Sequence, residues 1–478
     1  MHQCLLKSKI MDPRFRGDED KTMQNITIVG AGLAGSLLSI YLAKKGYGVN
    51  VYERRPDMRK ANVSTGKSIN LALSTRGIHA LKEVGLYDEI KKISIPMYGR
   101  MIHSLDGSIS LQPYGKDKTE YINSVSRSDL NKKLMDLAEE FPSVKFHFNM
   151  PCSSLNMDKN EIYFRNAETG NAETIKSDIT IATDGATSPI RMEMLKVPRF
   201  DFKQEYENYG YKELHIPPNE DGSFKMETNA LHIWPRGSFM LIALPNMDGS
   251  FTCTLFLAYD RSLGGENSFE ALNGKDKIQQ FFEKNFPDAI NLMPELLDDF
   301  SGNPTGTLIT IKCFPWCIEG KLAILGDSAH AIVPFFGQGM NAAFEDCTYL
   351  NECIDKFPGD WNRIFSEYQH LRKVNTDAIA DLAQENFIEM RDLVADARFQ
   401  LKKKIETLLY KKYPEIFIPK YTMVTFLRVP YSVALDRGRI QESILHELSE
   451  GISTPEETDM NRADEMVKNR LSKLDIIS

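Results

Sequence analysis

The sequence predicts an α/β fold made of a parallel-sheet domain in two pieces, an antiparallel β-sheet inserted between them, and a helical region toward the C-terminus. Three observations predict this arrangement. A strand, a glycine turn, a helix and a second strand follow one another within residues 25–55. Runs rich in β-forming residues, separated by Gly, Asn, Asp and Pro, fill residues 201–311. Helical periodicity then dominates residues 375–450.

Length and composition restrict the class of protein. A chain of 478 residues can bury a sizeable core, and 42% hydrophobic with 26% charged residues is ordinary for a globular protein. The net charge of -8, without a long basic block, argues against nucleic acid, because binding to phosphate backbones needs clustered Lys and Arg. The seven scattered cysteines are typical of reduced thiols. We expect a soluble, cytoplasmic protein with no membrane anchor and no metal site.

The domain boundaries are predicted from changes in the sequence pattern. The first residues lack the apolar core of a signal peptide and are interpreted as a disordered leader. Strand and helix patterns return after the β-rich insertion, so the parallel-sheet domain is expected to be discontinuous. The predicted parts are a leader at 1–22, the discontinuous domain at 23–200 and 312–374, the inserted substrate-binding sheet at 201–311, the helical domain at 375–450 and a polar tail at 451–478.

The opening pattern has the features of a Rossmann-like dinucleotide-binding unit. "NITIVG" is a strand, "SLLSIYLAKKG" a helix and "GVNVYERR" a second strand. The intervening "GAGLAG" places Gly30, Gly32 and Gly35 where the backbone can approach a pyrophosphate at a helix N-terminus. Glu53 ends the second strand, where an acidic residue can bind ribose hydroxyls. A tight turn without a ligand is the alternative, and the ordered set of elements favours the nucleotide site.

Two later strands each lead into a turn that contains an aspartate. "SDITIATDGATSPIR" presents Asp184 and Gly185, and "LAILGDSAH" presents Gly326 and Asp327. Taken alone, Asp184 fits a helix cap equally well. With the first motif, the set resembles the flavoprotein aromatic hydroxylases, whose FAD-binding domain is of the GR2 type. The resemblance implies that the second motif lies near the flavin and the pyridine nucleotide, and that Asp327 binds the ribityl chain.

The segment "VPFFGQGMNAAFED" combines glycines, two aromatic rings and the start of a helix. Its glycines let the backbone pass under a flavin ring, and the helix from Met340 directs its N-terminus at the end of the flavin where negative charge collects on reduction. Phe335 and Phe336 can pack on an aromatic substrate and exclude water, although simple core packing is an alternative. His330 is interpreted as a structural residue. The single dinucleotide fingerprint suits hydroxylases in which NADPH reacts and leaves.

Further motifs resemble the kynurenine 3-monooxygenase family over residues 25–442. They are "GKSINLALSTRG", "GRMIHSLDG", "LQPYG", "NSVSRSDLN", "GYKELHIP", "NALHIWPRG", "ENFIEM" and "IPKYTMVTF". The resemblance implies tight, non-covalent FAD, transient NADPH and O2, and hydroxylation of L-kynurenine at ring position 3 through a flavin C4a-hydroperoxide. Open alternatives are a hydroxylase of another aromatic substrate and a flavoprotein that senses an aromatic amino acid without turnover. A flavin-dependent halogenase is disfavoured, because the three tryptophans form no WxWxIP motif.

The same resemblance implies the residues of the site. Arg100 and Tyr114 would bind the substrate carboxylate, because a planar guanidinium pairs with a carboxylate through two charge-assisted hydrogen bonds. The expected substrate-binding set is Arg100, Tyr114, Asn386, Tyr421, Phe335, Phe336 and Gln338. The expected cofactor-binding set is Gly30, Gly32, Leu33, Ala34, Gly35, Glu53, Arg54, Arg55, Ala72, Arg127, Asp184, Gly185, Gly326, Asp327, Gly339, Met340 and Asn341. No acid–base residue is assigned, and we expect a monomer or a homodimer.

Overall fold

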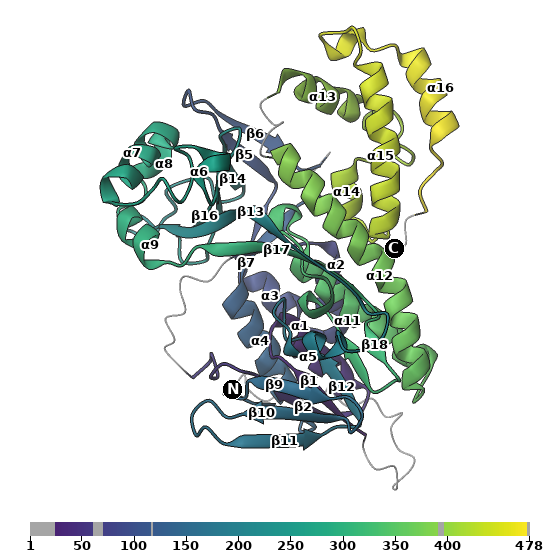
Figure 1. Cartoon of the computed structure of the whole chain (residues 1–478). Coiled ribbons are helices and arrows are strands. Elements are labelled where there is room, and N and C mark those ends of the chain that lie inside the picture. Colours follow the sequence, from purple (N-terminus) through teal and green to yellow (C-terminus); the bar gives the residue numbers. More distant parts are fainter. Residues whose placement is uncertain (1–23, 61–69, 116–117, 391–395, 476–478) are drawn as a thin grey trace, which may run out of the picture.

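The chain folds into three parts that meet along the long helix α12 (Trp361–Ile388), as Figure 1 shows. The computed structural model describes residues 24–60, 70–115, 118–390 and 396–475. The predicted leader at 1–22 lies outside the described residues. In Figure 1 the nucleotide-binding domain is at the bottom, the inserted sheet is at the upper left, and the C-terminal helices are at the upper right. The predicted α/β fold is confirmed.

The nucleotide-binding domain is built on a six-stranded sheet with the order β18-β19-β12-β1-β2-β8. The strands β19, β12, β1, β2 and β8 are parallel neighbours, whereas β18 is antiparallel to β19. Helix α1 lies against α4 and α11, and the strands are almost wholly apolar because both faces are buried. The bounds are β1 Asn25–Val29, α1 Leu33–Lys44, β2 Gly48–Tyr52, α4 Arg127–Glu139, β8 Val144–His147, β12 Ile179–Ala182, β18 Cys317–Ile318, β19 Leu322–Ile324 and α11 Gly339–Lys356.

Two small sheets complete this domain. The sheet β11-β10-β9 packs on the core, where Tyr52 of β2 stacks on Phe164 of β10 with 4.4 Å between ring centroids. The sheet β3-β7-β4 follows the nucleotide-binding unit in the chain and leads into the helices α2 and α3. The bounds are β3 Asn70–Leu73, α2 Thr75–Val84, α3 Tyr87–Lys92, β4 Ser94–Met97, β7 Ile122–Ser126, β9 Cys152–Asn156, β10 Glu161–Arg165, β11 Ala172–Lys176 and α5 Pro189–Met194.

The inserted sheet has seven strands in the order β17-β13-β16-β15-β14-β5-β6. The predicted range of 201–311 leaves out two strands of this sheet. Strands β5 and β6 come from the N-terminal piece of the chain, and β14 pairs with β5 in parallel. Periodicity indicates a strand but not its partner, so a pairing across more than a hundred residues leaves no local signal. The bounds are β5 Gly99–His103, β6 Ile109–Pro113, β13 Asp201–Ile216, β14 Leu231–Pro235, β15 Met240–Pro245, β16 Phe251–Ala258 and β17 Gly306–Phe314.

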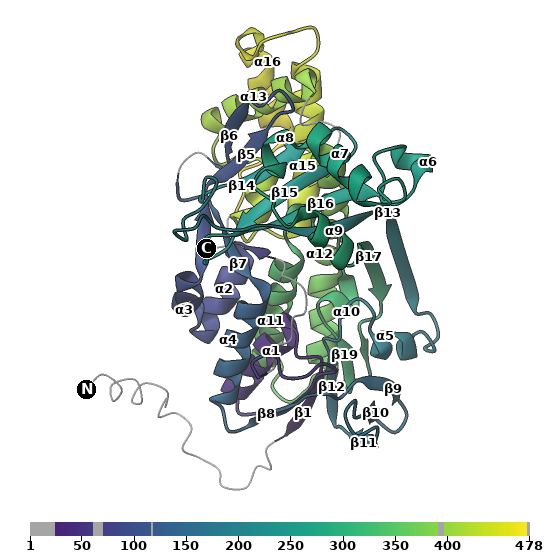
Figure 2. The same cartoon turned by 90° about the vertical axis from the view of Figure 1, so that its left-hand side faces the viewer.

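Three short helices between residues 275 and 302 cover the outer face of this sheet and lie in front of it in Figure 2. They enclose an aromatic core that includes Trp234, Phe251, Phe282 and Phe286, all at most 1% exposed. The opposite face of the sheet points toward the other two parts of the molecule. The bounds are α6 Arg261–Gly264, α7 Lys275–Asn285, α8 Pro287–Ile290 and α9 Leu296–Gly302.

The C-terminal region is helical, and its predicted boundaries need two corrections. The boundary at 374/375 falls inside α12, and the predicted polar tail contains α16, which buries Ala463, Met466 and Val467. Three apolar residues at helical spacing form a buried stripe even in a strongly charged sequence. No helix in the described ranges is both long enough and apolar enough to cross a membrane. The bounds are α13 Ala397–Lys412, α14 Lys420–Thr425, α15 Tyr431–Leu448 and α16 Met460–Arg470.

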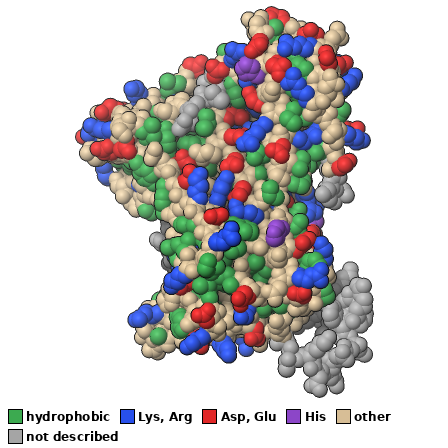
Figure 3. Space-filling model, turned by 45° about the vertical axis from the view of Figure 1, so that its right-hand side comes forward, with side chains coloured by type: hydrophobic (Ala, Val, Ile, Leu, Met, Phe, Trp, Pro, Cys, Tyr) green, Lys and Arg blue, Asp and Glu red, His purple; other side chains and the backbone are tan. Residues whose placement is uncertain are grey.

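The surface shown in Figure 3 mixes acidic and basic side chains. Lys and Arg are interspersed with Asp and Glu over the C-terminal helices at the top and over the nucleotide-binding domain at the bottom. Among the described residues on this face, no large area carries charge of one sign.

A buried chain of hydrogen bonds connects β5, β14 and α8. Asp288 Oδ2 lies 2.8 Å from His103 Nδ1, and His103 Nε2 lies 2.8 Å from His232 Nδ1. His232 Nε2 lies 2.7 Å from the Glu227 carbonyl oxygen, which can only accept. His232 therefore carries its proton on Nε2 and accepts through Nδ1. Burial lowers the pKa of His232 to about 4.

Acid is expected to destabilise the protein through His232. The folded state holds His232 in its neutral form, because its folded pKa lies below the ordinary value of about 6.5. The contribution of His232 to the free energy of unfolding is therefore complete above about pH 6.5 and is lost as pH falls from about 6.5 toward 4. The loss at pH 5 amounts to about 2 kcal/mol. Urea unfolding at neutral and acidic pH should show a smaller pH dependence for His232→Gln than for the wild-type protein. An identical pH dependence in both proteins would contradict this role of His232.

Candidate active site

A cavity of about 870 Å³ lies where the three parts meet. One group of lining residues comes from the nucleotide-binding domain and includes Gly30, Gly32 and Glu53. A second group includes Arg100, Tyr114 and the helical region's Tyr421. The same cavity therefore brings together most of the residues predicted to bind a cofactor and most of those predicted to bind a substrate.

The glycine turn before α1 brings the backbone closer than side chains would allow. Gly30 has a φ of +103°, and a Cβ there would lie 2.6 Å from the Thr183 carbonyl oxygen. A Cβ on Gly35 would lie 2.0 Å from the Gly30 carbonyl oxygen. Helix α1 begins without a side-chain cap, and Leu33 and Ala34 of its first turn line the cavity. Its free N–H groups suit a pyrophosphate.

Glu53 is fixed against this turn at the end of β2. Its Oε2 accepts a hydrogen bond of 2.8 Å from the Ala31 N–H, and its Oε1 accepts one of 2.8 Å from Arg55 Nε. Arg54 and Arg55 line the cavity beside it. The carboxylate is thus held next to the glycine turn, the position at which a ribose is expected.

The two aspartate turns lie next to each other. Ser328 Oγ donates to Asp184 Oδ1 at 2.8 Å, and burial raises the pKa of Asp184. Asp184 and Asp327 both line the cavity. Ser188 Oγ caps α5 by accepting from the Arg191 N–H at 2.9 Å. Asp184 Oδ2 also accepts from the Ile190 N–H of α5 at 3.4 Å, so Asp184 contributes to the cap as well as to the cavity. Both motifs therefore contribute carboxylates to the cavity.

A second helix also begins at the cavity. Helix α11 starts at Gly339 without a side-chain cap, and Gly339 and Met340 line the cavity. Asn341 does not line it: its Nδ2 donates to the Ala72 carbonyl at 2.8 Å and its Oδ1 accepts from the Ser74 N–H at 2.9 Å. Asn341 instead holds β3 against the turn that precedes α11. Two helix N-termini thus face one cavity, where they favour negative charge.

Arg100 lies among aromatic rings. Its Cζ is 4.9 Å from the Tyr421 ring centroid, and the Tyr421 ring stacks on Tyr114 at 5.3 Å and on Phe336 at 5.5 Å. Burial opposes the charge of Arg100, but Tyr421, Tyr114 and Glu389 raise its pKa, so it remains a cation. Burial also raises the pKa of Tyr114, which keeps its hydroxyl protonated. Within the part of the chain that the structure describes, Arg100 Nε and Tyr114 OH have no hydrogen-bond partner.

An aromatic and apolar wall adjoins Arg100. Phe335 stacks on Phe387 at 3.9 Å and lies 4.9 Å from Phe256. Much of this wall was not predicted from the sequence, although the lining side chains of β15 and β16 occupy every second position, which is the signal of one strand face. The missed residues include Met240, Ile242, Leu244, Thr252, Thr254, Phe256 and Met390.

Two predicted substrate-binding residues lie behind the cavity wall. Asn386 Nδ2 donates to the Phe335 carbonyl at 2.7 Å, and Gln338 Nε2 donates to Ser74 Oγ at 3.2 Å. Their amides therefore hold the wall in this structure. Three predicted cofactor-binding residues also lie outside the lining, because they support the lining segments and do not face the cavity. The predicted residues outside the lining are Gly35, Gly326, Gln338, Asn341 and Asn386.

These features fit FAD. Uncapped N-termini at α1 and α11 suit a pyrophosphate and the electron-rich end of a flavin. The carboxylate of Asp327 suits a hydroxyl-rich chain, since an ionised carboxylate only accepts hydrogen bonds. Arg127 and Ala72 also line the cavity. The fold and the cavity together define an FAD-dependent hydroxylase class of protein.

Comparisons with known proteins agree with this class. The family described as "FAD binding domain" matches residues 23–240. The solved structure of 2-methyl-3-hydroxypyridine-5-carboxylic acid oxygenase is 18% identical with a TM-score of 0.63, covering 79% of this chain and 95% of its own. That of p-nitrophenol 4-monooxygenase from Pseudomonas putida is 16% identical with a TM-score of 0.62, covering 90% and 98%. These structures share the fold.

Sequence relatives identify the family. Kynurenine 3-monooxygenase of Myxococcus xanthus is 47% identical over 94% of this chain and 95% of its own length. The proteins of that name from Flavobacterium johnsoniae and Dictyostelium discoideum are 50% and 46% identical, over 90% and 94% of this chain and 94% and 98% of their own. The chain belongs to the kynurenine 3-monooxygenase family, which confirms the resemblance found in the sequence.

Proposed function

We propose that the protein is an FAD-dependent monooxygenase that uses NADPH and O2 to convert L-kynurenine to 3-hydroxykynurenine. The observation that carries the proposal is that Arg100 and Tyr114 lie side by side, each with a buried polar atom that has no hydrogen-bond partner among the described residues, in a cavity that is continuous with the flavin site. The family membership supports it, because relatives named kynurenine 3-monooxygenase match nearly the whole chain.

Arg100 and Tyr114 bind the amino-acid end of the substrate. The guanidinium pairs with the carboxylate, and the protonated phenol donates to a remaining lone pair. The stacked rings of Tyr114 and Tyr421 lie beside this end of the substrate and both adjoin the Arg100 guanidinium. Pairing with a substrate carboxylate satisfies the polar atoms that have no partner among the residues the structure describes.

Phe335, Phe336 and the β15–β16 wall enclose the aromatic ring. Their side chains exclude water from the place where the ring meets the flavin. When bound and reduced, FAD supplies the site at which O2 is activated. The amine of the substrate already donates electrons to the ring carbon beside it, and no histidine lines the cavity in the described ranges. We therefore assign no acid–base residue.

The cofactor is held by groups from three motifs. The α1 N-terminus and Gly32 would receive the pyrophosphate, Glu53 the ribose and Asp327 the ribityl chain, and Gly339 and Met340 would contact the flavin ring. Gly30 and Gly35 keep the turn open by their lack of a side chain. Gly326 and Asn341 support these contacts from behind the lining.

The protein is proposed to work in the cytoplasm as a monomer or a homodimer. The six cysteines among the described residues are all free, which suits a reducing compartment. Size-exclusion chromatography with light scattering measures the oligomeric state directly.

The test is an assay of NADPH consumption and product mass. FAD is expected to copurify with the protein. NADPH consumption should rise on addition of L-kynurenine, and the product should be heavier by one oxygen atom. L-tryptophan, an aromatic amino acid without the aniline ketone, serves as the control. Binding of L-kynurenine without oxygen transfer would favour a sensor, and oxygen transfer only to other aromatic compounds would favour a different hydroxylase.

A further inference from the structure

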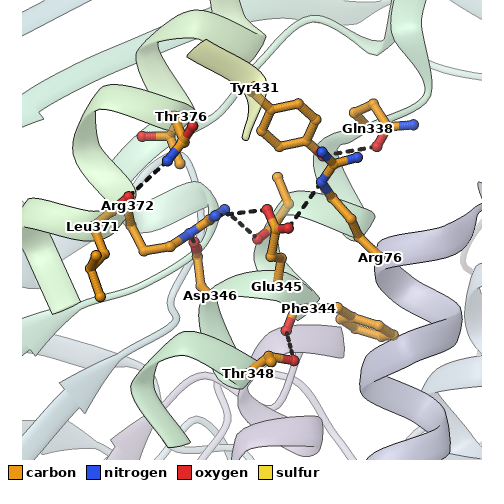
Figure 4. A network of polar contacts seen from close by, with 12 residues as sticks. Arg76, Gln338, Phe344, Glu345, Asp346, Thr348, Leu371, Arg372, Thr376 and Tyr431 are labelled. Carbon is orange, nitrogen blue, oxygen red and sulfur yellow. Dashed lines mark hydrogen bonds and ion pairs between the residues drawn. The ribbon is translucent and has the colours of Figure 1, made fainter. Parts of the chain in front are cut away.

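A chain of buried ion pairs connects three helices behind the cavity, as Figure 4 shows. Arg76 Nε of α2 lies 2.9 Å from Glu345 Oε1 of α11. Arg372 of α12 donates through Nη1 to Glu345 Oε2 and through Nε to Asp346 Oδ1, each at 2.7 Å. The four charges alternate in sign, and none of the residues is more than 5% exposed. The chain is therefore neutral, and removing one member would leave another charge buried and unpaired.

One end of this chain holds a cofactor turn. Asp346 Oδ2 accepts a hydrogen bond of 3.1 Å from the Gly326 N–H and lies 2.5 Å from His330 Nε2. Gly326 immediately precedes Asp327, which lines the cavity. The acidic end of the chain is thus attached to the turn that presents the Asp327 carboxylate.

The other end holds the C-terminal helical region. The Arg76 guanidinium donates to the carbonyls of Val424, Leu427 and Val429, which lie at the end of α14 and in the connection to α15. Its Cζ also lies 3.9 Å from the ring centroid of Tyr431. Helix α14 carries Tyr421, whose ring confines Arg100. One arginine therefore fixes the element that presents Tyr421.

A second contact ties the same segments together. Tyr431 OH donates to Gln338 Oε1 at 2.9 Å, and Gln338 Nε2 donates to Ser74 Oγ. Gln338 follows the Phe335–Phe336 pair in the chain. The guanidinium of Arg76 therefore connects α14, which carries Tyr421, with α11, whose N-terminus faces the cavity. Arg76 itself does not line the cavity.

We propose that Arg76 is a positioning residue for substrate binding, which rests on the proposed function of the cavity. Its guanidinium holds α14, and with it Tyr421, in a fixed position relative to α11 and the Asp327 turn. A buried network of ion pairs is generally no more stabilising than apolar packing of the same volume. We therefore attribute the role of Arg76 to the positions that it fixes and not to the stability that it adds. The planar fork is needed, because three carbonyls, a carboxylate and an aromatic ring are contacted by one group.

The test compares Arg76→Met and Arg76→Lys with a matched control. Arg437 of α15 is also buried and donates through Nη2 to the Ile416 and Ser472 carbonyls, at 2.6 and 2.8 Å, but both partners lie in the C-terminal region. Arg437→Met therefore removes a similar guanidinium without touching α2 or α11. The measurements are the dissociation constants of L-kynurenine and FAD, and hydrogen exchange of residues 420–430 without substrate.

Arg76→Met is expected to raise the dissociation constant for L-kynurenine by about tenfold or more, because a displacement of about 1 Å in a binding group is sufficient for such a loss. Exchange in residues 420–430 should accelerate, and FAD affinity should change by less than about threefold. Arg76→Lys should lie between the wild-type protein and Arg76→Met, and it carries the test if Arg76→Met does not fold. Arg437→Met should lower the thermal midpoint and leave L-kynurenine affinity nearly unchanged.

Two results would overturn the proposal. One is an equal loss of L-kynurenine affinity in the Arg76 and Arg437 variants, which would show a general effect of destabilising the helical region. The other is unchanged exchange in residues 420–430 of the Arg76 variants. A wild-type protein that does not bind L-kynurenine would overturn the proposed function, while the exchange measurement would still decide whether Arg76 positions α14.

Discussion

Replacing Arg100 with alanine is expected to raise the dissociation constant for L-kynurenine by about one and a half to three and a half decades. The variant would leave the substrate carboxylate unpaired in a buried site, and truncating one partner of such a pair typically costs about 2–5 kcal/mol. Arg100→Lys should recover part of the loss, since an ammonium lacks the planar fork. Titration of the flavin absorbance with L-kynurenine measures the effect.

Decarboxylated kynurenine provides the control for Arg100. It has no carboxylate to lose, so the wild-type protein and Arg100→Ala should bind it with similar affinity. FAD affinity should also be nearly unchanged, because the proposed contact belongs to the substrate. A variant that loses both ligands equally would show that Arg100 supports the wall of the cavity, since its guanidinium also contacts the Tyr421 ring.

Gly35→Ala is expected to abolish retention of FAD during purification. The new Cβ would lie 2.0 Å from the Gly30 carbonyl oxygen and 2.5 Å from Thr183 Oγ1, so the α1 turn must move away from β1. Overpacking of this kind costs about 1–3 kcal/mol, and here the distortion falls on the turn that receives the pyrophosphate. The ratio of flavin to protein absorbance and the thermal midpoint are the measurements.

Gly302→Ala is the matched control for Gly35→Ala. Gly302 ends α9, and a Cβ there would meet no atom within 4 Å. This variant should keep the flavin content and thermal midpoint of the wild-type protein. Full FAD retention by a folded Gly35→Ala protein would show that α1 and β1 can separate without loss of the pyrophosphate site.

Local patterns in the sequence were sufficient for the nucleotide-binding half of the site. Strand, glycine turn, helix and Glu53 follow one another within thirty residues, and the structure has β1, α1 and β2 in that order. The helix was predicted from Ser36, but α1 begins at Leu33, because the last three residues of the glycine motif form the first turn of the helix. Such a unit is predictable because its contacts join neighbours in sequence.

The substrate half depends on contacts between distant segments. Gln338 was expected at the substrate, but its amide is engaged by Ser74 and Tyr431, which are 264 and 93 residues away in the chain. Asn386 is similarly engaged by Phe335. A motif identifies such residues as part of the site, but the sequence does not show whether a side chain faces the cavity or supports its wall. The buried charges of Arg76 and Arg372 left no sequence signal, because their partners are not at helical spacing.

The strand order of the six-stranded sheet also determines when the protein can fold during its synthesis. Strand β12 ends at Ala182, but its neighbour β19 begins only at Leu322, 140 residues later. At about 5–20 residues per second, a ribosome needs roughly 7–28 seconds to supply it. During that time one edge of β12 has no strand to pair with, and such edges promote association between unfinished chains. Slow synthesis or an early stop between these strands should therefore increase the need for chaperones, although every residue of the glycine turn has already emerged.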